Sequence, residues 1–228
     1  MVPGLTRGTV TVRTLPESGR PSPVTAAAGA ITYYGTDKHF SVGYQPSQPV
    51  DYSHKLHAGD MGMDCRYCHS MVERSQHANI PATQTCMNCH WNVKVDSEKL
   101  LPIRESWATG KPVPWVRVHK LADFVQFNHS AHINANVGCA SCHGRVDQMP
   151  KVIQVQPLSM GWCLDCHRNP GEHIRPAGVS VTQMDWKPTK TDWQPLGQAP
   201  NGTPVAHAPT APNGRKVNPP LHCSGCHR

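Results

Sequence analysis

The chain has 228 residues, of which 38% are hydrophobic and 6% aromatic, and it carries 22 prolines and a formal net charge of +7. This apolar content is low for a protein that buries a conventional hydrophobic core, and no apolar run approaches the roughly 18 residues that a membrane-spanning helix needs. Lys and Arg residues are scattered, without a basic run or a helix-turn-helix pattern, which excludes the usual nucleic-acid-binding classes.

Residues 1–50 contain no ligand motif, and we expect them to form an extended N-terminal arm. Residues 1–20 alternate small, polar and basic side chains, so they lack the apolar centre of a secretory signal peptide. The most apolar stretch of the arm, residues 24–31, is too short and too weakly apolar to cross a bilayer.

The next segment, residues 51–126, is predicted to be a first di-haem module with a linker. It begins with Tyr-Ser-His-Lys-Leu-His at residues 52–57 and contains the pattern Cys-x-x-Cys-His at residues 65–69 and 86–90. This spacing is the attachment signature of c-type haem, in which both thiols bond covalently to the porphyrin. Because positions i, i+3 and i+4 share one face of a helical turn, the adjacent His supplies a ligand to the iron.

A second di-haem module repeats this arrangement over residues 127–169. It begins with Phe-Asn-His-Ser-Ala-His at residues 127–132 and carries the motif at residues 139–143 and 163–167. Such internal self-similarity predicts two units of similar structure. We expect a short helix at each motif, a short strand near residues 150–156, and irregular chain elsewhere.

The last segment, residues 170–228, is Pro-rich and ends with a fifth motif at residues 223–227. The motifs use all ten cysteines, so the sequence predicts five covalently bound haem c groups. Their attachment residues are Cys65, Cys68, Cys86, Cys89, Cys139, Cys142, Cys163, Cys166, Cys223 and Cys226. With so many porphyrins for the chain length, we expect a mostly irregular fold with short α-helices, packed around the five covalently attached haems.

Three other uses of paired cysteines fit less well. A zinc ribbon needs an even number of pairs and does not require a His after each one. A redox-active Cys-x-x-Cys needs a thioredoxin-like βαβ context, and a disulfide framework has no use for the histidines. The propionates of five haems also balance the basic residues, so the net charge gives no reason to expect a nucleic-acid partner.

Each motif supplies one axial ligand to its iron, namely His69, His90, His143, His167 and His227. The two histidines of each aromatic-x-His-x-x-His element share a helical face and reach two different irons, which selects as further ligands His54, His57, His129 and His132. For the remaining iron the candidates are His77 and His119. Met160 is a thioether alternative, although packing against a porphyrin is the more common use of such a residue. Because fully ligated irons leave no position for a substrate, we expect electron relay and no enzyme activity of the chain alone.

The chain resembles the pentahaem cytochrome c subunit of bacterial alternative complex III from about residue 44 to residue 228. The similarity is carried by residues 52–57 with the first motif, by Ile-Pro-Ala-Thr-Gln-Thr before the second motif, by residues 118–130, and by Pro-Leu-Ser-Met-Gly-Trp before the fourth motif. In similar small multihaem cytochromes, the first His of each pair usually ligates the haem of the following motif. The resemblance therefore implies that His54 serves the first motif and His129 the third.

The same resemblance implies a role in respiratory or photosynthetic electron transport on the periplasmic side of the cytoplasmic membrane. Electrons from menaquinol would arrive through iron–sulfur and membrane subunits of a quinol-oxidising complex. They would leave to a soluble or membrane-anchored cytochrome c, a copper protein or a terminal oxidase. Family members begin with a membrane helix, which residues 1–43 do not show, so we expect anchoring through partners or through an N-terminal segment missing from this sequence.

Two alternatives remain open at this point. The first is another electron-transfer role, either as a periplasmic shuttle or as a quinol dehydrogenase subunit that feeds a separate reductase. The second is a multihaem reductase, which would need an iron with an open coordination position.

Overall fold

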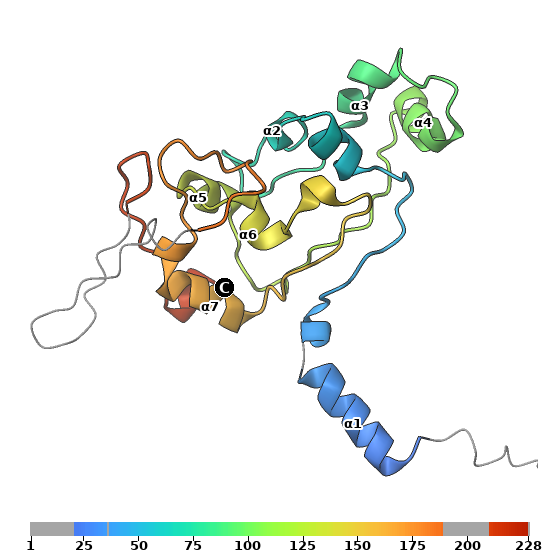
Figure 1. Cartoon of the computed structure of the whole chain (residues 1–228). Helices are drawn as coiled ribbons and strands as arrows, with labels where there is room; N and C mark the ends of the chain where they lie inside the picture. The colour runs from blue at the N-terminus through green and yellow to red at the C-terminus, as the bar shows by residue number, and fades with distance from the viewer. Residues whose placement is uncertain (1–20, 36, 189–209, 228) are drawn as a thin grey trace, which may run out of the picture. The chain divides into compact units, whose positions relative to one another are not determined.

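A computed structural model describes residues 21–35, 37–188 and 210–227 of the chain. Over these residues the backbone is mostly irregular, with short helices and with isolated β-bridges in place of strands, which confirms the expected fold class at this level. The chain divides into two compact units, one that extends to His39 and one that runs from Phe40 onward (Figure 1).

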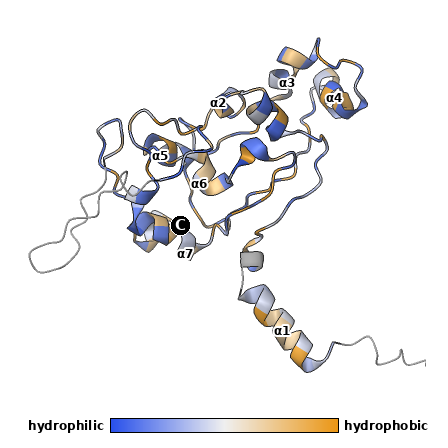
Figure 2. Ribbon diagram, viewed as in Figure 1, coloured by the Kyte–Doolittle hydropathy of each residue, from blue (hydrophilic) through white to orange (hydrophobic). Residues whose placement is uncertain are grey.

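The first unit contains helix α1, Pro23–Tyr34. The helix begins where the Ser22 hydroxyl accepts a hydrogen bond from the Thr25 amide at 3.1 Å. It carries no charged residue, and Figure 2 shows several hydrophobic positions along it. The side chains of Val24 and Ile31 are 78% and 72% exposed. The extended conformation that we expected is therefore wrong for this stretch, because its alanine-rich sequence favours a helix.

The rest of the predicted arm falls into two parts. Residues 1–20 lie outside the described residues, whereas residues 40–50 belong to the second unit. The Gln48 side chain donates to the carbonyl of Val116 at 2.7 Å and accepts from its amide at 2.9 Å. Within the part of the chain that the structure describes, no helix has both the length and the apolar character to cross a membrane.

A helical turn forms at every motif, as expected from the sequence. The first four motifs lie in α2 (Cys65–Cys68), α3 (Thr83–His90), α6 (Cys139–His143) and α7 (Met160–Arg168), and the fifth lies in the 3-10 turn η7 (Cys223–Gly225). A side chain caps the N-terminus of two of these helices. Asp64 accepts from the Arg66 amide at 2.8 Å before α2, and Ser159 accepts from the Trp162 amide at 3.2 Å before α7.

The two aromatic-x-His-x-x-His elements are also helical. The first continues into the π-helix η3, Lys55–Asp60, and the second forms α5, His129–Asn134. The remaining helices are η2 (Asp37–Phe40), η4 (Glu98–Leu100), α4 (Leu101–Thr109), η5 (Val146–Gln148) and η6 (Pro170–Glu172).

The strand that we expected near residues 150–156 does not form. Gln154 alone pairs with the chain at residues 43–44, through its carbonyl to the Gly43 amide at 2.8 Å and its amide to the Tyr44 carbonyl at 3.0 Å. The Gln154 side chain is 2% exposed and donates to two backbone carbonyls, of Phe40 and Gln156. Through the hydrogen bonds of its backbone and of its side-chain amide, Gln154 holds two irregular segments together without a β-ladder.

The apolar core of the described residues is small. Its main cluster lies between α3 and α4 and consists of Val50, Met87, Ile103 and Val113, with Cys86, Leu100 and Trp115 packed against it. Most other large apolar side chains are partly or largely exposed. A core of this size agrees with an interior that depends on groups other than side chains.

Candidate haem centres

Three of the five motif histidines are oriented by a hydrogen bond on one ring nitrogen, whereas Nδ1 of His227 is buried without a hydrogen-bond partner. The Nδ1 atoms of His69, His90 and His167 donate to the backbone carbonyls of Asn79, Val93 and Pro220, at 2.6, 3.0 and 2.9 Å. A carbonyl accepts only from a protonated nitrogen, so the proton is fixed on Nδ1 and the Nε2 lone pair is left available. This is the arrangement that supporting hydrogen bonds give to a metal-binding imidazole.

The histidines of the two aromatic elements are held in the same way. Nδ1 of His57 donates to the Ser53 carbonyl at 2.9 Å, and Nδ1 of His132 donates to the Asn128 carbonyl at 2.8 Å, in each case one helical turn earlier. Nδ1 of His129 donates to the Gln76 carbonyl at 2.9 Å. These rings therefore also present Nε2 as a free donor to a metal.

An aromatic ring supports each of these histidine pairs. Tyr52 stacks on His57, with centroids 4.5 Å apart, and meets His54 edge-on at 4.8 Å. Phe127 repeats both contacts, stacking on His132 at 4.5 Å and meeting His129 edge-on at 4.7 Å. The sequence repeat is thus a repeat of side-chain geometry, and it fixes the directions in which the two imidazoles of a pair point.

Three of these outer histidines face a motif histidine across a gap. The ring centroids are 6.3 Å apart for His57 and His90, 6.1 Å for His132 and His167, and 6.5 Å for His129 and His143. Two imidazoles on opposite sides of one metal ion have centroids roughly 6.3 Å apart, from metal–nitrogen bonds of about 2 Å and about 1.1 Å from nitrogen to ring centre. The spacing therefore fits an iron between each pair.

The first motif also has a histidine of an aromatic element near it, namely His54. Burial, together with the nearby His69 and His57, lowers the pKa of His54 to about 4, and its Nδ1 is buried without a hydrogen-bond partner. His143 of the third motif is buried as well, and burial with the nearby His119 lowers its pKa to about 3. Both imidazoles therefore stay neutral at physiological pH, which is the form that binds metals.

The other predicted ligands lie elsewhere. The ring of His119 is 4.4 Å from that of His143 at an angle of 79°, which is too close for a metal ion between them. Its Nε2 atom is buried and has no hydrogen-bond partner. His77 is exposed in the loop after the first motif, and Met160 is 66% exposed at the start of α7. The structure thus brings His129, rather than His119, to the position opposite His143.

The fifth motif has a different environment. The side chain whose ring contacts His227 is Phe124, with centroids 5.5 Å apart, and no described histidine makes a ring contact with it. Backbone pairing fixes this contact, because the Gln126 amide donates to the Cys226 carbonyl at 2.8 Å and Val125 bridges to His227. Sequence analysis did not single out Phe124 as a site residue, and no spacing rule connects it with a motif that lies about 100 residues later.

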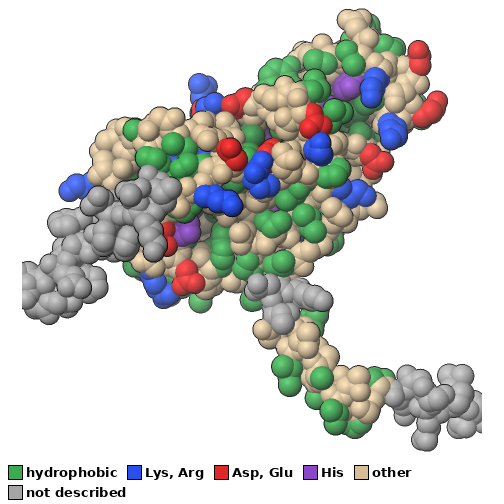
Figure 3. Space-filling model, viewed as in Figure 1, with side chains coloured by type: hydrophobic (Ala, Val, Ile, Leu, Met, Phe, Trp, Pro, Cys, Tyr) green, Lys and Arg blue, Asp and Glu red, His purple; other side chains and the backbone are tan. Residues whose placement is uncertain are grey.

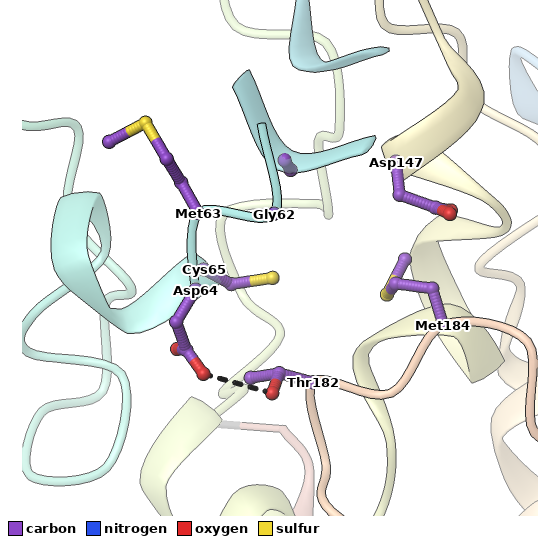
Figure 4. A pocket seen from close by; sticks show the side chains of 8 residues that line it. Gly62, Met63, Asp64, Cys65, Asp147, Thr182 and Met184 are labelled. Atoms are coloured by element: carbon purple, nitrogen blue, oxygen red, sulfur yellow. Dashed lines mark hydrogen bonds between the residues drawn. The ribbon is translucent and has the colours of Figure 1, made fainter. Parts of the chain in front are cut away.

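None of the cysteines is paired in a disulfide, and all ten lie in the described residues. At the first motif the Cys65 sulfur points into a pocket lined by residues of three segments, including Gly62, Thr182 and Met184 (Figure 4). The thiol therefore has open space beside it, as covalent attachment of a large planar group requires.

On the face that Figure 3 shows, the charges of the described residues do not form a patch of one sign. Lys and Arg side chains are interspersed there with Asp and Glu. Several charges are paired locally: Arg66 contacts Asp64 at 2.9 Å and Glu73 at 3.2 Å. This agrees with the scattered basic residues of the sequence.

Comparison with known proteins gives one curated relative. No protein-family model matches the chain. The chain is 39% identical over 100 residues to the "Menaquinone reductase, multiheme cytochrome c subunit" of Nitratidesulfovibrio vulgaris strain Hildenborough. The alignment covers 43% of this chain and 47% of the relative, so the chain spans about half the length of that protein. Similarity to a multihaem cytochrome c subunit agrees with the repeated attachment motif.

Proposed function

We propose that this chain is a pentahaem cytochrome c that relays electrons as a subunit of a quinol-linked membrane complex. The observation that carries the proposal is the set of imidazole pairs at 6.1–6.5 Å, each of which joins a motif histidine to a histidine outside the motifs. The residues present fit the predicted cofactor. Each haem c would be held by the two thiols of a motif and by the adjacent His.

The histidines that would hold the irons in pairs are His57 with His90, His132 with His167, His129 with His143, and His54 with His69. A haem iron held in this way would supply one-electron chemistry between its ferric and ferrous forms. The chain's own contribution is to fix the imidazoles with carbonyl hydrogen bonds and stacked rings. Burial also keeps the imidazole of His143 neutral, because it lowers the pKa of that group. At these four sites an iron held by two imidazoles would have no position for a substrate, which supports relay over catalysis there. At the fifth motif no described histidine makes a ring contact with His227.

The finer assignment is to an alternative complex III type of complex, outside the cytoplasmic membrane. In this proposal iron–sulfur and membrane subunits oxidise menaquinol and pass electrons to the chain, which passes them to a cytochrome c, a copper protein or a terminal oxidase. The resemblance of residues 44–228 to the pentahaem subunit supports this direction of flow. The haem attachment signature supports the location, since covalent attachment of haem c takes place after export.

A second direction of flow is favoured by the curated relative, whose printed name is a menaquinone reductase subunit. The same relay would then deliver electrons towards menaquinone. The contacts described above serve either direction equally, because an electron relay has no intrinsic polarity until the potentials of its donor and acceptor are set.

The test uses the complex purified from native membranes and, separately, the isolated haem-loaded chain. Haem content by the pyridine haemochrome assay and intact mass should give five haems for each chain. We expect menaquinol analogues to reduce the haems in the complex but not in the isolated chain, with reoxidation by added cytochrome c. Direct reduction of the isolated chain by the quinol would instead establish the quinol dehydrogenase alternative, and turnover of nitrite would establish a reductase.

A further inference from the structure

The described residues place the five motifs next to one another in an order that differs from their order in the sequence. The second motif adjoins the first: the Asn88 side chain, inside the second motif, donates to the Tyr67 hydroxyl, inside the first, at 3.2 Å. His57, which lies before the first motif, faces His90 of the second.

The first motif adjoins the third rather than leading on from the second. One segment ties the two motifs together, because the Val181 carbonyl accepts from the Cys139 amide at 3.0 Å and the next residue, Thr182, donates to Asp64 at 3.1 Å (Figure 4).

The third motif adjoins the fourth through α5. His129 on this helix faces His143 of the third motif, and His132, one turn later, faces His167 of the fourth. The fourth motif in turn adjoins the fifth, since His167 donates through Nδ1 to the carbonyl of Pro220, which lies three residues before Cys223. In Figure 1, α3 and the end of the chain at η7 lie at opposite ends of a path that passes through α2, α6 and α7.

Exposure follows the same order. Of the ten cysteines, the two that are exposed are Cys89 in the second motif and Cys223 in the fifth. The first, third and fourth motifs have every cysteine at least partly buried.

We propose that the haem sites at the five motifs, numbered here in sequence order, form one linear electron route. The route runs from the second site through the first, third and fourth to the fifth, so that the second and fifth sites are its ends. The inference rests on the proposed relay function. Each transfer moves one electron between adjacent irons, so that one iron goes from ferrous to ferric and its neighbour from ferric to ferrous, with no bond made and no proton moved. The electron enters from, and leaves to, the donor and acceptor proteins named above, at the two exposed ends.

The test is a redox titration of the full-length haem-loaded protein with an inorganic reductant, followed by NMR of the individual haem methyl signals. The matched variants His57→Met and His132→Met change equivalent positions in the two modules. An axial Met raises the potential of its haem, so the second site should become reduced first in H57M and the fourth in H132M. The added electron then lowers the potential of adjacent sites by repulsion.

We expect H57M to shift the first site downward and to leave the third unchanged, and H132M to shift the third and the fifth. A shift of the third site in H57M would overturn the order. Should a variant lose haem, through-space contacts between haem methyls of the wild type decide the matter. Contacts between the haem methyls of the first and third sites would support the route, whereas contacts between those of the second and third sites would refute it. Neither measurement involves quinol, so a failed quinol reaction would count against the proposed function alone.

Discussion

The guanidinium of Arg175 packs directly against Gly138, so that a Cβ atom at this position would overlap the arginine side chain. Arg175 is 1% exposed, donates to the Ser180 carbonyl, and lies 5.3 Å from the ring centre of Trp186. Because the carbonyl and the indole ring hold the guanidinium, it has no free direction in which to move. Gly138 directly precedes Cys139, so this close approach helps to place the third motif.

We therefore expect Gly138→Ala to lower the stability of the haem-loaded protein by about 1–3 kcal/mol through overpacking. The backbone angles of Gly138, φ −75° and ψ 148°, are open to any residue, so the effect is purely steric. Thermal or denaturant unfolding measures it. The control is Gly161→Ala, just before the fourth motif, where a Cβ meets nothing within 4 Å. Its stability should stay equal or rise slightly, and an equal loss in both variants would contradict the steric account.

A second prediction concerns the sixth ligands. Replacing His129 by Ala removes the ring that faces His143 at 6.5 Å and should convert one low-spin haem to a high-spin form. Electron paramagnetic resonance of the oxidised protein detects this change. His77→Ala is the control, since the exposed His77 lies in the loop that contacts α5 but faces no motif histidine, and its spectrum should match the wild type. A high-spin signal in H77A without one in H129A would reverse the assignment.

The sequence allowed the motif helices and the two histidine pairs to be predicted because both depend on spacing within one helical turn. His57 and His132 were expected to cross to other haems, but only the folded chain brings them to His90 and His167. The carbonyls that orient the imidazoles, such as those of Gln76 and Pro220, leave no signal in a sequence, because every residue carries a carbonyl. The contact of Phe124 with His227 joins segments about 100 residues apart, so no local pattern marks it.

The third prediction concerns the stacked aromatic rings. Because Tyr52 and Phe127 make the same two ring contacts, the hydroxyl of Tyr52 is not needed for the geometry. We expect Tyr52→Phe to keep the wild-type haem spectrum and stability. Tyr52→Ala removes the stacked ring and should lower the stability. Because Tyr52 is partly exposed, the loss should be smaller than the roughly 3–5 kcal/mol that truncation of a fully buried aromatic side chain costs. A redox titration should then show displaced potentials at the first and second sites.

Phe127→Leu and Phe127→Tyr form the matched pair in the second module. The tyrosine variant should behave as the wild type, whereas the leucine variant should show altered potentials at the third and fourth sites. If Tyr52→Phe itself altered the haem spectrum, the hydroxyl rather than the stacked ring would be the group that positions the pair.

The last prediction concerns the cap of α2. Asp64 accepts hydrogen bonds from the side chain and the amide of Arg66, and these bonds, the side-chain one foremost, lower its pKa from 3.8 to about 2. A carboxyl whose pKa is lower in the folded than in the unfolded chain stabilises the fold above the unfolded value, and this contribution is lost as the pH falls toward the folded value. Asp64→Ala should therefore cost about 0.5–2 kcal/mol at neutral pH through the lost cap. Asp64→Asn keeps the cap and should cost less.

The pH dependence separates charge from capping. The stability difference between the wild type and Asp64→Asn should be complete above about pH 4 and should fade as the pH approaches 2. Asp165→Asn is the control, because this carboxyl is 80% exposed and lies 3.7 Å from Arg168, a surface pair that contributes little. Denaturant titrations of the three haem-loaded proteins at a series of pH values measure the difference. A gap between the wild type and D64N that stayed constant down to pH 2 would show that the carboxylate charge plays no part in holding the first motif.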